Sequence, residues 1–137
     1  MEYILTAPLD DIARRMVFAP LGMRSTGYHP LRGGRLIDAS QAEHAAFTER
    51  DPASGEWLRG VVHDENARFL GGVSGNAGVF SNLRDGIRYA RMLACGGETP
   101  EGRFLAPSTL REAIRNHTPG MGENRGLAFQ LAGGYAG

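Results

Sequence analysis

Apolar residues fall at helical spacing in three stretches of the chain, and each stretch predicts a helix with one buried face. The first stretch ends at Pro20 and Gly22, which stop a helix, and the second runs from Ser81, a good helix cap, to Gly96. The third covers residues 107–116. The side chains predicted to face the core are Leu9, Ile12, Ala13, Met16 and Val17; Leu83, Ile87, Ala90 and Leu93 or Ala94; and Leu110, Ala113 and Ile114.

Between and after these helices, the pattern favours short extended segments. Ser25–Pro30 is predicted to be extended, and Ala45–Thr48 and Trp57–Val62 are the better strand candidates in a region without a clear period. Gly126–Leu131 alternates weakly and predicts a further strand. Phe69–Ser81 is dense in glycine, which permits tight turns and a close approach of the backbone to other groups. The predicted fold class is therefore α/β, of the α+β type.

Composition and charge narrow the range of functions. The formal net charge of the 137 residues is zero, which argues against nucleic acid or an anionic membrane as a partner. All 15 basic residues are arginine. The lack of lysine excludes a P-loop, a Schiff base and a Ser-x-x-Lys pair within this chain. No apolar run approaches the roughly 20 residues of a membrane span, and no signal-peptide pattern is present, so the compartment and the oligomeric state stay open.

Common catalytic motifs and metal-binding motifs are incomplete. Residues 72–76 match the Gly-x-Ser-x-Gly nucleophile elbow at all but the last position, and the glycines of residues 120–126 are one residue too far apart for a dinucleotide-binding loop. The histidines and Cys95 lack the spacing of metal ligands, so neither a metal nor a cofactor is expected. Asp64 and Glu65 would point in opposite directions on an extended chain, which makes them a poor acid–base pair.

Three segments resemble a known family, the beta-lactamase-related serine hydrolases of the class C beta-lactamase and esterase type, which are also related to penicillin-binding proteins. Residues 18–27 (FAPLGMRSTG) are similar to its "PLGM…T" segment. Residues 62–67 (VHDENA) and 71–81 (GGVSGNAGVFS) are similar to the "VHDxxA" and "GGvaGHAGlFS" segments of one branch. The helix Leu83–Leu93 also fits the usual continuation of the family.

The resemblance implies a fold. Residues 1–137 would form a single partial domain from the helical region of the beta-lactamase/transpeptidase-like fold, lacking its N-terminal and C-terminal parts and most of the central antiparallel sheet. The family's Ser-x-x-Lys and Tyr-x-Asn motifs would lie before Met1, and its Lys/His-x-Gly motif after Gly137. No catalytic residue is therefore carried over, and this chain alone is expected to be inactive.

The resemblance also implies a binding role for part of the glycine-dense segment. Gly71 and Gly72 are expected to serve close packing, whereas Ser74 and Asn76 are the candidate substrate-binding residues on a pocket wall. Asn76 stands where the family usually has histidine, so it keeps hydrogen bonding but loses titration. His63 and Asp64 could hold each other by a hydrogen bond, more plausibly as a structural pair than as a catalytic one.

Three functions remain open from the sequence. In the first, the longer protein forms an acyl-serine from an ester, a beta-lactam or a D-alanyl peptide, so its substrate is a small molecule or a peptidoglycan-type compound. In the second, the chain is a non-catalytic binding or structural module that keeps the family's scaffold. The third and least favoured is a hydrolase that uses Ser74 with His63, for which no third, orienting residue is evident.

Overall fold

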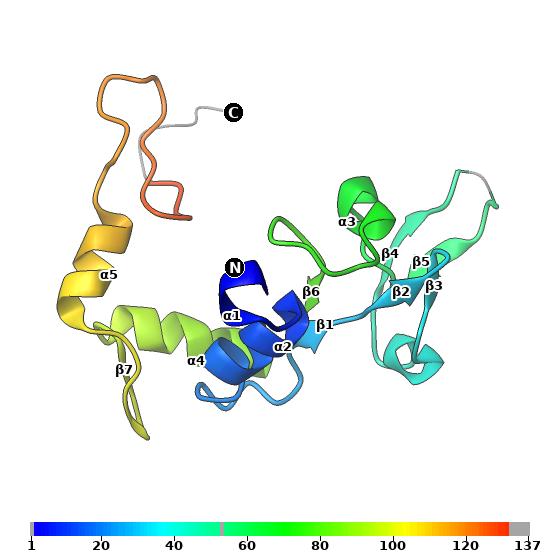
Figure 1. Cartoon of the computed structure of the whole chain (residues 1–137), viewed down its shortest axis with the longest axis horizontal. Helices are drawn as coiled ribbons and strands as arrows, with labels where there is room; N and C mark the ends of the chain where they lie inside the picture. Colours follow the sequence, from blue (N-terminus) through cyan, green and yellow to red (C-terminus); the bar gives the residue numbers. More distant parts are fainter. Residues whose placement is uncertain (1, 53, 132–137) are drawn as a thin grey trace. The chain divides into compact units, whose positions relative to one another are not determined.

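The structure is a computed structural model that describes residues 2–52 and 54–131. The chain divides into two compact units, residues 1–87 and residues 88–137. Each unit combines helices with short two-stranded antiparallel sheets (Figure 1), which confirms the predicted α+β composition. The prediction of one partial domain stays a prediction. Within the described residues, no helix has the length and apolar character needed to cross a membrane.

The first unit begins with two short helices and a wider turn. α1 (Glu2–Leu5) is followed by α2 (Leu9–Ala13), which continues as the π-helical turn η1 (Arg14–Phe18). Of the predicted apolar stripe, Ile12 is buried but Met16 is exposed, because the wider π turn moves later side chains away from the face that Ile12 occupies.

The segment after η1 turns the chain as the sequence predicts. The amide of Leu21 donates to Val17 O at 3.1 Å, and the amide of Met23 donates to Phe18 O at 2.8 Å. Gly22 adopts the left-handed conformation, with φ of +65°, which glycine tolerates without steric cost. Leu21 and Met23 are both buried, so this turn also fills part of the core.

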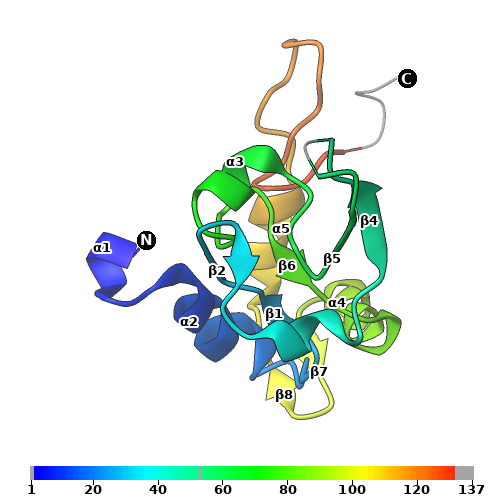
Figure 2. The ribbon, with the colours of Figure 1, turned by 90° about the vertical axis from the view of Figure 1, so that its right-hand side faces the viewer.

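Three antiparallel strand pairs follow in the first unit. β1 (Gly27–Tyr28) pairs with β6 (Val79–Phe80), and β2 (Leu31–Arg32) pairs with β3 (Arg35–Leu36). The register of the first pair sets Gly27 opposite Phe80, so two segments about fifty residues apart lie side by side (Figure 2).

The third strand pair is a hairpin of β4 (Phe47–Arg50) and β5 (Trp57–Arg59). It confirms two of the predicted extended segments to within a few residues. The 3-10 helix η2 (Ala39–Ala42) precedes it, and the short helix α3 (Glu65–Phe69) follows it. Both segments were expected to be irregular or extended. The two helices were missed because each is too short for apolar periodicity to reveal it.

A small core holds these elements together. Leu31, Val62 and Ala67 are buried against one another, and partly buried side chains pack around them. The ring of His29 stacks on Phe80 with centroids 3.9 Å apart, and His29 Nδ1 lies 2.9 Å from Gly60 O. The contact between His29 and Gly60 joins the β1–β6 pair to the segment that leads into α3.

α4 (Leu83–Ala94) contains the boundary between the two units and shows a different face from the one predicted. Leu83 is 81% exposed and Ile87 is 56% exposed, whereas Asp85 and Met92 are 3% and 1% exposed. The cap is Asn82, not Ser81, because Asn82 Oδ1 accepts a hydrogen bond from the amide of Asp85 at 2.9 Å. The Asp85 carboxylate can be buried because it accepts hydrogen bonds from Ser25 and Thr26. The helix face that carries Asp85 therefore points inward.

The second unit continues with the pair β7 (Glu98–Thr99) and β8 (Gly102–Arg103) and the helix α5 (Pro107–Ile114). Leu110 is buried as predicted, while Ile114 is about half exposed. The strand predicted at Gly126–Leu131 is wrong. Among the described residues, the only β-bridge of this segment is the isolated one between Arg125 and Gln130. The segment turns back on itself, because the amide of Gly126 donates a hydrogen bond to Phe129 O.

Candidate functional site

A cavity of about 660 Å³ opens on the first unit, between the glycine-dense segment and the residues that precede α3. One wall is residues 74–81, which include β6. The other residues that line it are Tyr28, Thr48, Val62, His63 and Asp64. Segments from four separate parts of the sequence therefore build this cavity.

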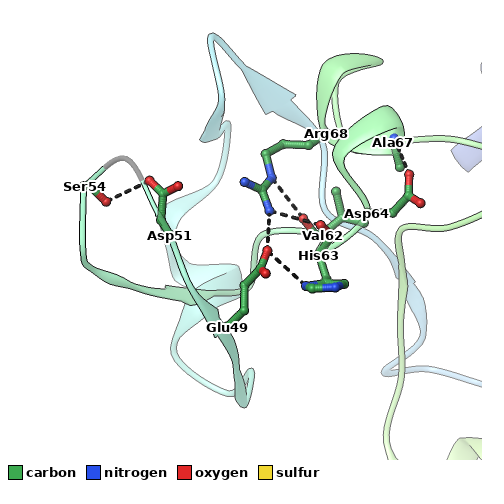
Figure 3. Close-up of polar contacts among 8 residues, drawn as sticks. All are labelled: Glu49, Asp51, Ser54, Val62, His63, Asp64, Ala67 and Arg68. Atoms are coloured by element: carbon green, nitrogen blue, oxygen red, sulfur yellow. Dashed lines mark hydrogen bonds and ion pairs between the residues drawn. The ribbon is translucent and has the colours of Figure 1, made fainter.

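A carboxylate and a guanidinium hold the His63 side of the cavity. His63 Nδ1 lies 3.0 Å from Glu49 Oε1, and Arg68 Nη2 lies 3.0 Å from the same oxygen. Arg68 also donates to Val62 O at 3.2 Å and to His63 O at 3.1 Å. Figure 3 shows the Glu49 carboxylate between the Arg68 guanidinium and the His63 ring. The Glu49 carboxylate therefore has a guanidinium on one side and an imidazole nitrogen on the other.

Asp64 is the cap of α3. Its Oδ1 accepts a hydrogen bond from the amide of Ala67 at 2.7 Å. This bond lowers the pKa of the Asp64 carboxyl from its ordinary value, with a smaller lowering from the side chain of Asn76. The expected hydrogen bond between His63 and Asp64 is not formed, because each group has another partner. Of the two residues expected on extended chain, Asp64 does have an extended backbone, but Glu65 is already helical.

Ser74 and Asn76 both line the cavity, on the wall where the sequence placed them. Ser74 Oγ donates to Asn76 Oδ1 at 2.5 Å. The hydroxyl of Tyr28 donates to Ser74 O at 3.0 Å, which ties this wall to β1. Burial raises the pKa of Tyr28 above its ordinary value, and the charge of Asp10 adds to the effect, so Tyr28 stays protonated and remains a donor.

Two glycines let the cavity wall come close to the chain beneath it. A Cβ on Gly72 would lie 2.5 Å from His29 O, and a Cβ on Gly78 would lie 2.4 Å from Gly72 O. Both residues have positive φ, of +83° and +108°. The expected close packing is therefore seen at Gly72, and also at Gly78. At Gly71, a Cβ would lie 3.5 Å from Leu31 O, which is an ordinary contact.

The site residue that sequence reasoning missed is Glu49. It lies on β4, 14 residues before His63, and no local motif connects the two. Its carboxylate lies 3.0 Å from His63 Nδ1, on the side of the ring where a reactive histidine would need an orienting carboxylate. Ser74 Oγ, however, donates to Asn76, and no hydrogen bond joins Ser74 to His63 within the described part of the chain. The structure does not assemble the Ser74–His63 pair of the third hypothesis.

Replacing Glu49 with glutamine is expected to lower the free energy of unfolding by about 1 kcal/mol, because one charge of a partly screened network is lost. The side chains of Glu49 and Arg68 are 31% and 22% exposed, so solvent weakens the pair without abolishing it. Urea unfolding followed by circular dichroism would measure the change. Glu56→Gln is the matched control, since Glu56 is exposed on the same hairpin, and an equal loss in both variants would contradict the prediction.

Comparison with known proteins gives concordant matches. A family model described as Beta-lactamase matches residues 2–137. A protein of Salmonella enteritidis PT4 named as a candidate D-alanyl-D-alanine carboxypeptidase is 30% identical over 126 residues, which cover 87% of this chain and 29% of that protein. A protein of Salmonella newport with the same name is 33% identical over 122 residues, covering 84% and 28%.

Among solved structures, the chain is similar to the crystal structure of a candidate beta-lactamase from Bacteroides dorei DSM 17855. The TM-score is 0.47 and the sequence identity is 17%, over 84% of this chain and 24% of that chain. The present chain thus spans less than a third of the length of these relatives.

Proposed function

Since the chain belongs to the beta-lactamase family, we propose that it is part of a serine hydrolase that cleaves D-alanyl peptides through an acyl-serine. The observation that carries this proposal is the family match along nearly the whole chain. The names of the Salmonella relatives favour a D-alanyl peptide over an ester or a beta-lactam as the substrate.

In the proposed reaction, a serine oxygen attacks the carbonyl carbon of the penultimate D-alanyl residue. The bond to the terminal D-alanine breaks, and that residue leaves as the free amine after it takes a proton. Water then attacks the acyl-serine ester, which releases the shortened peptide and restores the serine hydroxyl. The activating lysine must come from other residues of a longer protein, because this chain has none.

The part of this chain in the proposed reaction is to bind the substrate. Ser74 and Asn76 are the proposed contact residues, since both line the cavity and both carry hydrogen-bonding groups. The crowded backbone at Gly72 and Gly78 supports this role, because it holds the wall in one conformation. A pre-formed wall binds substrate without the entropy cost of ordering a loop.

Covalent labelling followed by intact-mass measurement tests the proposal. The chain of residues 1–137 is expected to form no adduct with a fluorophosphonate or with penicillin. A longer protein that adds a Ser-x-x-Lys segment is expected to form one adduct per chain with each reagent. A serine adduct on the shorter chain would contradict the assignment of the nucleophile to other residues, and an inert longer protein would contradict the reaction.

The second candidate function is a non-catalytic binding module that keeps the scaffold. Two observations favour it: the complete lack of lysine, and an asparagine at position 76 in place of the family's histidine. On this alternative, residues 1–137 would unfold cooperatively as they stand, and no serine of a longer protein would be acylated. Thermal unfolding by circular dichroism, together with the labelling experiment, separates the two functions.

A further inference from the structure

The β4–β5 hairpin carries an aromatic cluster on one of its faces. Phe47 and Arg59 are direct partners across the two strands, and Trp57 lies two residues before Arg59 on β5. Because side chains alternate between the faces of a strand, these three residues share one face, the aromatic face. The rings of Phe47 and Trp57 meet edge to face, with centroids 6.5 Å apart. The two side chains are 60% and 59% exposed, so the described residues leave this face uncovered.

Arg59 is held in place over the Phe47 ring. Its guanidinium carbon lies 5.2 Å from the ring centroid, within the range of a cation–π contact. Arg59 Nε donates to Ala45 O at 2.9 Å, and Arg59 Nη2 donates to Glu43 O at 2.6 Å. An arginine has five N–H donors, so the guanidinium keeps donors for a ligand that lies against the rings. Because these contacts already fix the guanidinium, little side-chain entropy is lost when a ligand binds.

Charge and size argue against two other kinds of partner for the aromatic face. Residues 43–59 contain more acidic residues than arginines, so the hairpin is not a basic patch for a phosphate backbone or an anionic membrane. β4 has four residues and β5 has three. A two-stranded face of this length measures about 13 Å by 5 Å. Stable protein–protein interfaces bury about 800 Å² on each partner, which is far more than this face supplies.

A sugar ring matches the aromatic face in its chemistry. The faces of an aromatic ring carry partial negative charge, and the axial C–H bonds of a pyranose carry partial positive charge, so the two attract each other when they stack. The donors of Arg59 suit the carbonyl oxygen of an N-acetyl group on such a ring. The nearby carboxylate of Glu49 does not compete for these donors, because it contacts His63 and Arg68 (Figure 3).

We propose that the β4–β5 hairpin binds a chain of N-acetylated amino sugars, with Phe47 and Trp57 against the sugar rings and Arg59 donating to an N-acetyl carbonyl. The inference rests on the proposed function, because a peptidoglycan-type substrate attaches its D-alanyl peptides to such a chain. None of the three residues lines the cavity that contains Ser74 and Asn76, so the hairpin is a second contact with the same polymer. A second contact raises the local concentration of the attached peptides.

Tryptophan fluorescence tests the inference directly, because Trp57 is the only tryptophan of the chain. The probes are chitotetraose, a tetramer of N-acetylglucosamine, and cellotetraose, a glucose tetramer with the same linkage and no N-acetyl groups. Chitotetraose is expected to change the Trp57 emission in a saturable manner, and cellotetraose is expected to bind about tenfold more weakly. No change with chitotetraose, or equal binding of both sugars, would overturn the inference.

Two exposed phenylalanines provide a variant and its matched control. Phe47→Leu removes one ring of the aromatic face and should raise the dissociation constant of chitotetraose about tenfold. Phe69→Leu is the same substitution on α3, where the side chain is 89% exposed, and should leave binding unchanged. Neither side chain is buried, so both variants should keep the circular dichroism of the parent chain. Equal losses of affinity in the two variants would contradict a specific role for the hairpin.

Other occupants of the aromatic face would give different results. A second copy of the chain would make the Trp57 emission change on dilution without sugar, and a membrane would make it change on addition of phosphatidylglycerol vesicles. Either result would overturn the inference. In a nitrogen-15 spectrum of the parent chain, chitotetraose should shift the amide resonances of residues 47–50 and 57–59. Shifts confined to other residues would also overturn it, and this readout does not depend on the folding of a variant.

The proposed function and this inference can fail separately. Chitotetraose carries no peptide, so its binding does not depend on a serine nucleophile. A longer protein that is acylated by penicillin but does not bind chitotetraose would retain the function and lose the inference. A longer protein that binds chitotetraose but is never acylated would retain the inference and lose the function.

Discussion

Replacing Gly78 with alanine is expected to lower the free energy of unfolding by about 3 kcal/mol or more, since strain and overlap act together. The new Cβ would lie 2.4 Å from Gly72 O and 3.2 Å from Tyr28 Cδ1. The first of these is a backbone atom, so it cannot be relieved by a side-chain rotation. The φ of +108° adds strain for any residue with a Cβ.

Gly75→Ala is the matched control for this substitution. Gly75 lies on the same cavity wall, has no heavy atom within 4 Å of a built Cβ, and does not have a positive φ. It is expected to leave stability unchanged or slightly raised, because alanine restricts the unfolded chain. Urea unfolding of both variants by circular dichroism measures the difference, and similar midpoints for Gly78→Ala and Gly75→Ala would refute the packing described for this wall.

Replacing Asp85 with alanine is the second large expected effect, at about 3 kcal/mol of lost stability, because two hydrogen bonds to a buried carboxylate disappear. Asp85 Oδ2 accepts from the amide of Ser25 at 2.7 Å and from Thr26 Oγ1 at 2.9 Å. These bonds join the start of α4 to the segment before β1, which is 60 residues away in the sequence. Without them, the Ser25 amide loses its acceptor.

Two variants and a local readout make this prediction specific. Asp85→Asn keeps an acceptor oxygen and should lose about half as much stability, since only the charge-assisted part of each bond is removed. Arg84→Ala changes the exposed neighbour and should have little effect. Hydrogen exchange of the Ser25 amide should become faster in Asp85→Ala and stay slow in Arg84→Ala. Unchanged exchange at Ser25 in every variant would show that this bond does not hold the segment.

The helices illustrate which parts of the fold the sequence predicts. All three predicted helices exist, because helical spacing, capping residues and terminating glycines act within a few residues of one another. The buried face of α4 was predicted wrongly for a related reason. Periodicity identifies an apolar face, but it contains no information on Ser25 and Thr26, whose hydrogen bonds allow the Asp85 carboxylate to be buried.

The residues of the candidate site were likewise predicted only in part from the sequence. Ser74 and Asn76 were placed on the pocket wall from the resemblance of residues 71–81 to a family segment, and the structure does set both on a cavity. Their role in binding stays a prediction. Glu49 could not be found in this way, because the hairpin that brings it to His63 has no motif of its own.

By itself, the sequence determined the helix positions, the family and the absence of a lysine nucleophile activator, since these depend on residue identity and short-range spacing. Only the tertiary structure decided that Glu49 lies beside His63, that Asp64 caps a helix beside the cavity, and that Gly78 lies against Gly72. These contacts join segments that the folded chain brings together. Their free energy depends on distance in space and not on separation in the sequence.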